Sequence, residues 1–254
     1  ATNSSLLYVN ENIQGGNASG DSWTNAIPEL ADAIEIAINN PSITEIWVAA
    51  GTYFPRYLGD GQFESNNIYG TIFNIANLKL YGGFSGNEAS REERNWKDNP
   101  TIISANIGAP ETNHDNLPEL IISNGATKET ILDGFIVEEA NGLKSTIQFS
   151  NSTARHIINH CIIRNNRAMF GALRFTGITN SIIANSLFLR NNGYQVGGLM
   201  NDAGASSQVL NTNFIGNSGQ NGGAIENYGQ LSIANNIFWS NRSNLSTTHD
   251  IYTE

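Results

Sequence analysis

Cysteine and charge are both scarce in this sequence, and each shortage excludes a class of protein. The single cysteine, Cys161, excludes an intrachain disulfide and falls in an apolar context typical of a small buried side chain. Charged residues make up 14% of the chain and the net charge is −10. We therefore expect no nucleic-acid partner, because phosphate recognition depends on clustered Lys and Arg. The same acidity disfavours tight binding to acidic polysaccharides unless a metal ion bridges the charges.

Long apolar runs and phosphate-binding loops are also missing. No stretch reaches the roughly 18 consecutive apolar residues of a membrane-spanning helix, so we expect no insertion into a membrane. No secretory leader is recognisable at Ala1, as expected of a mature or a truncated chain. Neither GxGxxG nor GxxxxGK[ST] occurs in the context of a strand and a helix, which gives no support to a nucleotide-binding site.

A regular repeat fills the second half of the chain. Similar segments begin at Ile121, Ile147, Leu173, Leu199 and Ile225, and successive starts differ by 26 residues (147−121, 173−147, 199−173, 225−199). A fixed period of this length is typical of a solenoid. The units hold short β-branched and aromatic runs broken by Asn, Gly and Ser, without helical periodicity. This pattern predicts coils of three short strands joined by bends, stacked in parallel about 4.8 Å apart.

Alignment at 26 residues predicts which side chains stack from coil to coil. The predicted apolar columns are Ile131, Ile157, Ile183, Val209 and Ile233; Ile136, Ile162, Phe188, Phe214 and Phe238; and Val137, Ile163, Leu189, Ile215 and Trp239. Two polar columns are Asp133, Asn159, Asn185, Asn211 and Asn235, and Glu139, Asn165, Asn191, Asn217 and Asn241. We interpret the polar columns as structural ladders that satisfy backbone groups at the bends.

The sequence predicts one domain over residues 1–254, with an N-terminal cap in 1–45. A helix is expected near residues 28–39, where Leu30, Ile34, Ala37 and Ile38 share a face, and it would cover the open edge of the first coil. Irregular coils with long loops should fill 46–119, and regular coils 120–254. Because Ile251 lies 26 residues after Ile225 (251−225), we expect further coils or domains to follow Glu254 as partners.

Several blocks of the sequence resemble right-handed parallel β-helix proteins of the pectate-lyase-like superfamily. The blocks are EIWVAAGTYFP at 45–55, LYGGFSGNEASREERNW at 80–96, NPTIISANIG at 99–108, ILDGFIV at 131–137, and FIGN and GGAI within 214–225. They are similar to blocks in secreted surface proteins of Bacteroidetes-type bacteria and to the repeats of polymorphic outer-membrane proteins. The resemblance implies an all-β, right-handed, single-stranded parallel β-helix with an N-terminal α-helical cap, located outside the cell or on its surface. It does not select a reaction, because the superfamily includes lyases, hydrolases, adhesins and tailspikes.

One group of residues could serve a uronate polysaccharide lyase. Such an enzyme needs a base to remove a proton next to a carboxylate, and cations to neutralise that carboxylate. Alignment places Arg164 and Arg190 in one column beneath Glu138, which makes these three the catalytic candidates. The structural alternative is a surface ion pair with one additional arginine. A hydrolase finds less support, since no paired carboxylates of the polygalacturonase type occur in the coils.

Aromatic residues in loops and at bends are candidates for binding a polysaccharide or a cell-surface glycan. Phe170 and Tyr194 lie near one corner of successive coils, and Tyr57 and Tyr69 lie in a long polar loop. Exposed rings at these positions could stack on sugars, whereas the structural alternative is that they cover coil edges. No zinc motif is present, and Ca²⁺ is the only metal with some support, from loop carboxylates such as Asp60 and Asp115.

The sequence therefore favours a non-enzymatic extracellular β-helix module of a bacterial surface or secreted protein. It would act as an adhesin, a stalk or a glycan-binding surface, with no required cofactor. A polysaccharide-active enzyme, most of all a uronate lyase, is the alternative.

Overall fold

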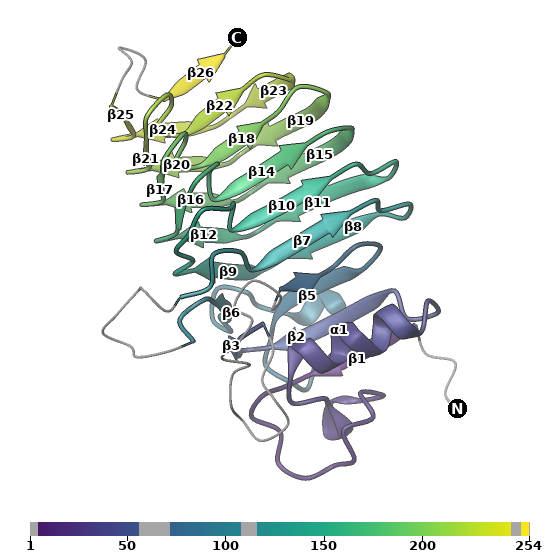
Figure 1. The fold of residues 1–254 in the computed structure, drawn as a ribbon. Coiled ribbons are helices and arrows are strands. Elements are labelled where there is room, and N and C mark those ends of the chain that lie inside the picture. Colours follow the sequence, from purple (N-terminus) through teal and green to yellow (C-terminus); the bar gives the residue numbers. More distant parts are fainter. Residues whose placement is uncertain (1–4, 56–71, 108–115, 245–249, 254) are drawn as a thin grey trace.

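In the computed structural model the chain forms a parallel β-helix, in which coils of short strands stack along one axis (Figure 1). The structure describes residues 5–55, 72–107, 116–244 and 250–253. Over these residues the strands form four sheets and α1 is the one α-helix. The predicted all-β solenoid with a helix at its start is therefore confirmed.

Sheet A is the longest sheet and runs from the N-terminal cap to the last coil, in the order β1-β2-β5-β8-β11-β15-β19-β23. Its strands are β1 (Leu6–Val9), β2 (Glu45–Ala49), β5 (Lys79–Phe84), β8 (Thr130–Asp133), β11 (Arg155–Asn159), β15 (Thr179–Ala184), β19 (Ala205–Leu210) and β23 (Gln230–Ala234). Neighbouring strands come from successive coils and pair in parallel, as β11 does with β8 and β15.

Sheets B, C and D complete each coil. Sheet B contains β3 (Gly51–Tyr53), β6 (Thr101–Ser104), β9 (Phe135–Glu138), β12 (Ile162–Arg164), β16 (Leu187–Leu189), β20 (Asn213–Ile215) and β24 (Ile237–Trp239). Sheet C contains β4 (Phe73–Asn74), β7 (Ile121–Asn124), β10 (Ile147–Ser150), β14 (Leu173–Thr176), β18 (Leu199–Asn201), β22 (Ile225–Asn227) and β26 (Ile251–Thr253). The four-stranded sheet D contains β13 (Arg167–Ala168), β17 (Asn192–Gly193), β21 (Ser218–Gly219) and β25 (Arg242–Ser243).

The period of 26 residues holds throughout the regular part of sheet C. Ile147 pairs with Ile121 on one side and with Leu173 on the other. The pairing continues to Ile225 and Ile251, so β26 begins a sixth coil in the predicted register. Sheet C thus confirms the repeat that the sequence suggested.

Sheets A and B shift by one residue between the second and third coils, which the alignment did not predict. Arg155 pairs with Asn180, a step of 25 (180−155). The reason is a shorter bend: β10 to β11 spans eight residues (155−147), whereas Leu173 to Asn180 spans seven (180−173). The connection from β17 to β18 is one residue longer than the connection from β13 to β14. This extra residue compensates for the shorter bend, so sheet C keeps its register.

The shift corrects the predicted apolar columns. In sheet A the fully buried column is Leu132, Ile158, Ile183 and Val209. In sheet B it is Val137, Ile163, Phe188 and Phe214, which continues to Phe238. The last three rings stack at centroid distances of 4.6 and 5.2 Å with nearly parallel planes. Burial of such rings is worth roughly 2–3 kcal/mol each, so this column is a main source of stability.

The bends repeat a left-handed backbone conformation at equivalent positions. After sheet A the residues with positive φ are Gly134, His160, Asn185, Asn211 and Asn235; after sheet B they are Glu139, Asn165, Arg190, Gly216 and Ser240. Asparagine tolerates this conformation better than most residues, which explains part of its abundance. The predicted ladder through Asn165 is wrong by one position, because the buried ladder is Asn166, Asn191, Asn217 and Asn241.

The helix α1 (Leu30–Asn39) packs against β1, β2 and β4 at the start of the solenoid. Leu30, Ala33, Ile34 and Ala37 are buried against the first coil, whereas Ile38 is 52% exposed and does not belong to the predicted face. The helix covers the end of the core and limits strand addition there. In the described part of the chain, no helix has the length and apolar character that crossing a bilayer demands.

Candidate functional site

The three residues considered for lyase chemistry do not converge on one site. Arg164 on β12 lies beside Glu138 on β9, and its Nε donates to Oε2 of Glu138 at 2.6 Å. Because of the one-residue shift, the neighbour of Arg164 in the next coil is Leu189, and Arg190 lies in the following bend. The structure therefore shows an ion pair on sheet B and a separate arginine.

Of the four aromatic candidates, the structure describes Phe170 and Tyr194. The ring of Phe170 lies beneath the Arg174 guanidinium at 4.3 Å, and Arg174 is paired with Asp202 at 2.8 Å. Tyr194 is 59% exposed, so its ring is accessible to a ligand. Tyr57, Tyr69 and the Ca²⁺ candidates Asp60 and Asp115 lie outside the described residues.

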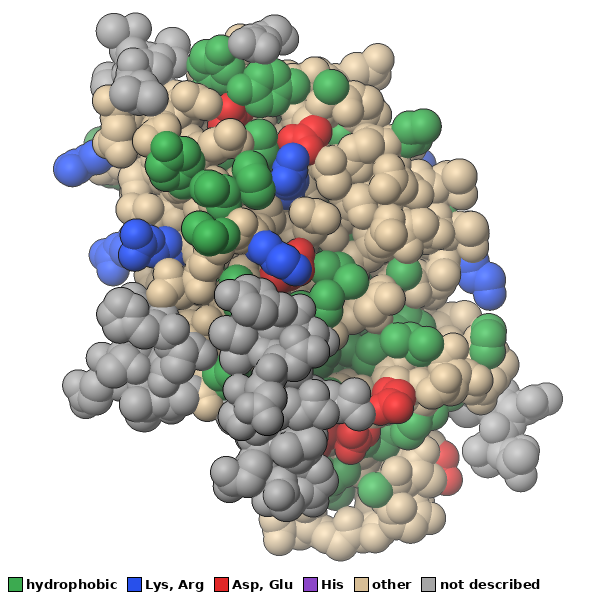
Figure 2. Space-filling view, viewed as in Figure 1, with side chains coloured by type: hydrophobic (Ala, Val, Ile, Leu, Met, Phe, Trp, Pro, Cys, Tyr) green, Lys and Arg blue, Asp and Glu red, His purple; other side chains and the backbone are tan. Residues whose placement is uncertain are grey.

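Tyr194 lines a shallow groove over sheet D, which we call the Tyr194 groove. Its volume is about 370 Å³, and its lining residues are Gly142, Leu143, Arg167, Ala168, Met169, Asn192, Gly193, Tyr194, Gln220 and Asn244. Figure 2 shows hydrophobic and basic side chains together along the left edge of this face, where Figure 1 places β17, β21 and β25. The bend is held in place by the Tyr194 amide, which donates to the Ala168 carbonyl at 2.9 Å.

The Tyr194 groove combines an exposed aromatic ring with polar side chains that can form further hydrogen bonds. Among the described residues, Tyr194 stacks on no other ring and Arg167 forms no ion pair. The amides of Asn192, Gln220 and Asn244 line the same surface. An amphipathic ring beside amide and guanidinium donors can bind a ligand that has both apolar faces and hydroxyl groups.

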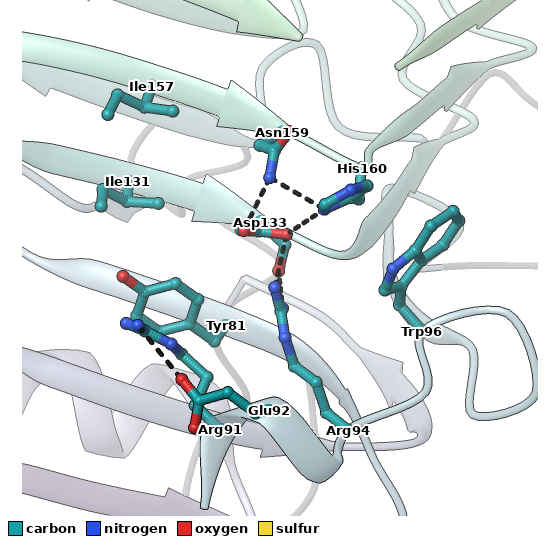
Figure 3. A pocket seen from close by; sticks show the side chains of 10 residues that line it. All are labelled: Tyr81, Arg91, Glu92, Arg94, Trp96, Ile131, Asp133, Ile157, Asn159 and His160. Atoms are coloured by element: carbon teal, nitrogen blue, oxygen red, sulfur yellow. Dashed lines mark hydrogen bonds and ion pairs between the residues drawn. The ribbon is translucent and has the colours of Figure 1, made fainter. Parts of the chain in front are cut away.

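A second concave surface lies on the outer face of sheet A, and none of the residues predicted for a site lines it. Trp47, Tyr81, Phe84 and Ile131 form an apolar cluster there, outside the main core. Where this cluster opens to solvent it leaves a pocket of about 580 Å³, which we call the outer pocket (Figure 3). The outer pocket is lined by Tyr81, Arg91, Glu92, Arg94, Trp96, Ile131, Asp133, Ile157, Asn159 and His160.

Asp133 joins the two sides of the outer pocket. Its carboxylate accepts from Arg94 at 2.8 Å and from Asn159 at 3.0 Å, and Nδ1 of His160 lies 3.1 Å away. Arg94 also donates to the Gly82 carbonyl at 3.0 Å. These contacts fasten the charged loop of residues 85–100 to sheet A.

Aromatic rings make up the rest of the outer pocket. Trp96 stacks on His160 at 4.8 Å, and the Arg91 guanidinium lies 4.7 Å from the centre of the Tyr81 ring. Burial raises the pKa of Tyr81 and nearby acids add to this, although Arg91 opposes the shift. The sequence does contain a signal for this site, because Ile131 and Ile157 each stand next to a second apolar residue in the same strand, which places apolar side chains on both faces of sheet A.

Two further titratable groups are sealed in the coil interior. Burial lowers the pKa of His156 to about 4 and raises that of Cys161 to about 12. Cys161 is 1% exposed, as expected from the sequence, and such a thiol is unreactive. Over the residues that the structure describes, no group of three or more His, Cys, Asp or Glu could hold a metal ion.

Comparison of the chain with protein-family models, curated proteins and solved structures finds no match. The class of the protein is therefore defined by its own architecture, which is a parallel β-solenoid with a helix at its start.

Proposed function

We propose that the chain is a non-enzymatic, extracellular glycan-binding module of a bacterial surface or secreted protein. We propose in addition that the chain is related to the pectate-lyase-like β-helix proteins. Its role would be that of an adhesin or a stalk. The observation that carries it is the Tyr194 groove, where a 59% exposed ring lies beside an arginine and three amides.

The Tyr194 groove suits a sugar for three physical reasons. Its volume of about 370 Å³ falls within the range of roughly 300–1,000 Å³ that is common for small-molecule sites. The ring supplies a large contact surface that loses little conformational freedom on binding. The groove lies on bends that parallel strands hold in register, so the binding groups are positioned before the ligand arrives.

The positions of Arg164, Arg190 and Glu138 favour binding over lyase chemistry at these three residues. A lyase needs a cation that can neutralise the substrate's carboxylate. The Arg164 guanidinium is already neutralised by Glu138, and Arg190 lies in another position of the coil. Ca²⁺ held by Asp60 or Asp115 remains part of the proposal as a ligand of the module.

A glycan array tests this proposal. The wild-type protein should bind a defined set of glycans, and Tyr194→Ala should lower their affinity at least about tenfold because the stacking surface is removed. Trp239→Ala is the matched control, since Trp239 is an exposed aromatic residue (69%) outside the groove. Equal losses in both variants, or a wild-type protein that binds no glycan, would refute the role of the groove.

An assay for lyase activity tests the alternative directly. The protein is incubated with pectate and alginate, with and without Ca²⁺, and the absorbance of the unsaturated product is followed. We expect no increase in absorbance. An increase that disappears in Arg164→Ala would establish the enzyme and overturn the non-enzymatic proposal.

A further inference from the structure

The outer pocket shares no lining residue with the Tyr194 groove, and it offers different chemistry. We propose that the outer pocket binds a terminal sugar acid that carries an N-acyl group. Arg91 would hold the single carboxylate, and Ile131 and Ile157 would contact the acyl group. This inference does not depend on ligand binding at Tyr194.

Arg91 is the cation of the outer pocket that can exchange its ion-pair partner, Glu92, for the carboxylate of a ligand. Its side chain is 41% exposed, and its acidic neighbour Glu92 is 3.7 Å away and 75% exposed. A pair of this kind contributes little free energy and is readily replaced. Contact with the Tyr81 ring holds the guanidinium at the rim of the pocket, which reduces the entropy lost when an anion binds (Figure 3).

The charges that line the outer pocket favour an anion with one charge. Arg91 and Arg94 are balanced by Glu92 and Asp133, and Arg94 is committed to Asp133 at 2.8 Å. A monocarboxylate can take the place of Glu92 beside Arg91, because the 75% exposed Glu92 side chain is able to turn towards solvent. A phosphate dianion would add a second negative charge beside Asp133 and Glu92, which is unfavourable. The planar guanidinium also matches the geometry of a carboxylate.

The apolar part of the outer pocket favours a ligand with an acyl group. Ile131 and Ile157 occupy paired positions on β8 and β11, and their side chains lie together beside Tyr81 (Figure 3). Ile157 packs against the outer apolar cluster and is only partly buried. Covering this remaining surface with a methyl or methylene group removes apolar area from water and stabilises the complex.

The polar groups at the other side of the pocket favour a sugar over a peptide. Asn159 and Nδ1 of His160 are bonded to Asp133, which leaves Nε2 of His160 as the group that can bond to a ligand, and Trp96 stacks on the same imidazole (Figure 3). Groups of this type bind hydroxyls that have fixed geometry on a ring. The pocket volume of about 580 Å³ is sufficient for a ligand with a carboxylate, an acyl group and several hydroxyls.

Titration with five small probes tests the inference. One of them, N-acetylleucine, has an acyl group and a carboxylate but no ring hydroxyls, and it should bind more weakly than N-acetylneuraminic acid. N-acetylneuraminic acid should bind, glucuronic acid should bind more weakly because it lacks the acyl group, and N-acetylglucosamine should bind more weakly because it lacks the carboxylate. Inorganic phosphate should not compete. Arg91→Gln should weaken the binding of N-acetylneuraminic acid about tenfold or more, whereas Arg155→Gln, at an exposed arginine outside the pocket, should leave it unchanged.

Two further variants show whether the ligand is held by the outer pocket itself. Ile157→Ala should reduce the preference for N-acetylneuraminic acid over glucuronic acid, and it provides a second test if Arg91→Gln fails to fold. Tyr194→Ala should retain this binding, so failure at the Tyr194 groove leaves the inference standing. Equal binding of N-acetylglucosamine, unchanged affinity in Arg91→Gln, equally tight binding of N-acetylleucine, or no binding at millimolar concentration would each overturn it.

Discussion

The buried His156 makes the stability of this solenoid sensitive to acid. His156 is fully buried, its ring stacks on Phe149 at 4.6 Å, and its Nε2 lies 3.0 Å from the Ser123 hydroxyl. Burial disfavours the charged imidazolium, which lowers the pKa of His156 from 6.5 to about 4. Between these two values the unfolded chain binds a proton that the folded chain does not. The contribution of His156 to stability is therefore lost as the pH falls from about 6.5 to about 4.

This behaviour gives a prediction for the variant His156→Gln. The difference in free energy of unfolding between the wild type and the variant should shift by about 3 kcal/mol against the wild type between pH 7 and pH 4. Denaturant unfolding at several pH values measures it, and carboxylates elsewhere titrate in both proteins and cancel. A difference that stays constant over this range would show that His156 is not held neutral by burial.

At the same scale, sequence reasoning found part of the candidate sites. It identified Tyr194 because an aromatic residue outside the apolar columns is conspicuous in a repeat. It could not place Trp96 against His160, because that contact joins an irregular loop to a distant coil and no local pattern encodes it. It also aligned Arg164 with Arg190 on neighbouring strands. The alignment was wrong by one residue, because Arg164 pairs with Leu189 and Arg190 lies in the following bend.

Among the elements, the bends after sheet B carry a ladder of buried asparagines. The Oδ1 atom of Asn217 accepts from the backbone amide and the side-chain amide of Asn191, both at 3.0 Å. The Nδ2 atom of Asn217 donates to the Phe188 carbonyl and to Asn241, also at 3.0 Å. Each rung thereby satisfies backbone groups that the bend leaves without strand partners.

The ladder predicts a large effect for Asn217→Ala. The substitution leaves several buried donors and acceptors without partners, and it should destabilise the protein by about 2–4 kcal/mol. Asn192→Ala is the matched control, because Asn192 is exposed, and its cost should stay below about 0.5 kcal/mol. Thermal and denaturant unfolding measure both, and similar losses in the two variants would argue against the ladder.

The elements also show which part of the fold a sequence can specify. The strands and the helix follow from apolar spacing that each segment carries locally, so their kind and approximate position could be predicted. The one-residue shift between β11 and β15 could not, because a shorter bend after β14 is compensated before β18 and the period in sheet C stays at 26. Only the pairing of the strands reveals which of two adjacent apolar residues points inward.

At the scale of the whole molecule, the solenoid presents two separate concave surfaces. The core columns and ladders account for most repeated positions, and the candidate binding groups lie on bends and on the irregular loop of residues 85–100. The net charge of −10 does not prevent local recognition of an anion, because charges farther away than about 8–10 Å are screened at physiological salt.

Hydrogen exchange with and without a bound glycan tests the central claim most directly. If the module binds its glycan in the Tyr194 groove, backbone amides in segments 167–169, 192–195 and 218–220 should exchange more slowly in the complex, because these residues form or border the groove. The exchange rates of backbone amides in sheets A, B and C should be the same with and without this ligand. Protection centred on β9 and β12, around Glu138 and Arg164, with none at the Tyr194 groove, would contradict the account and favour the enzymatic alternative.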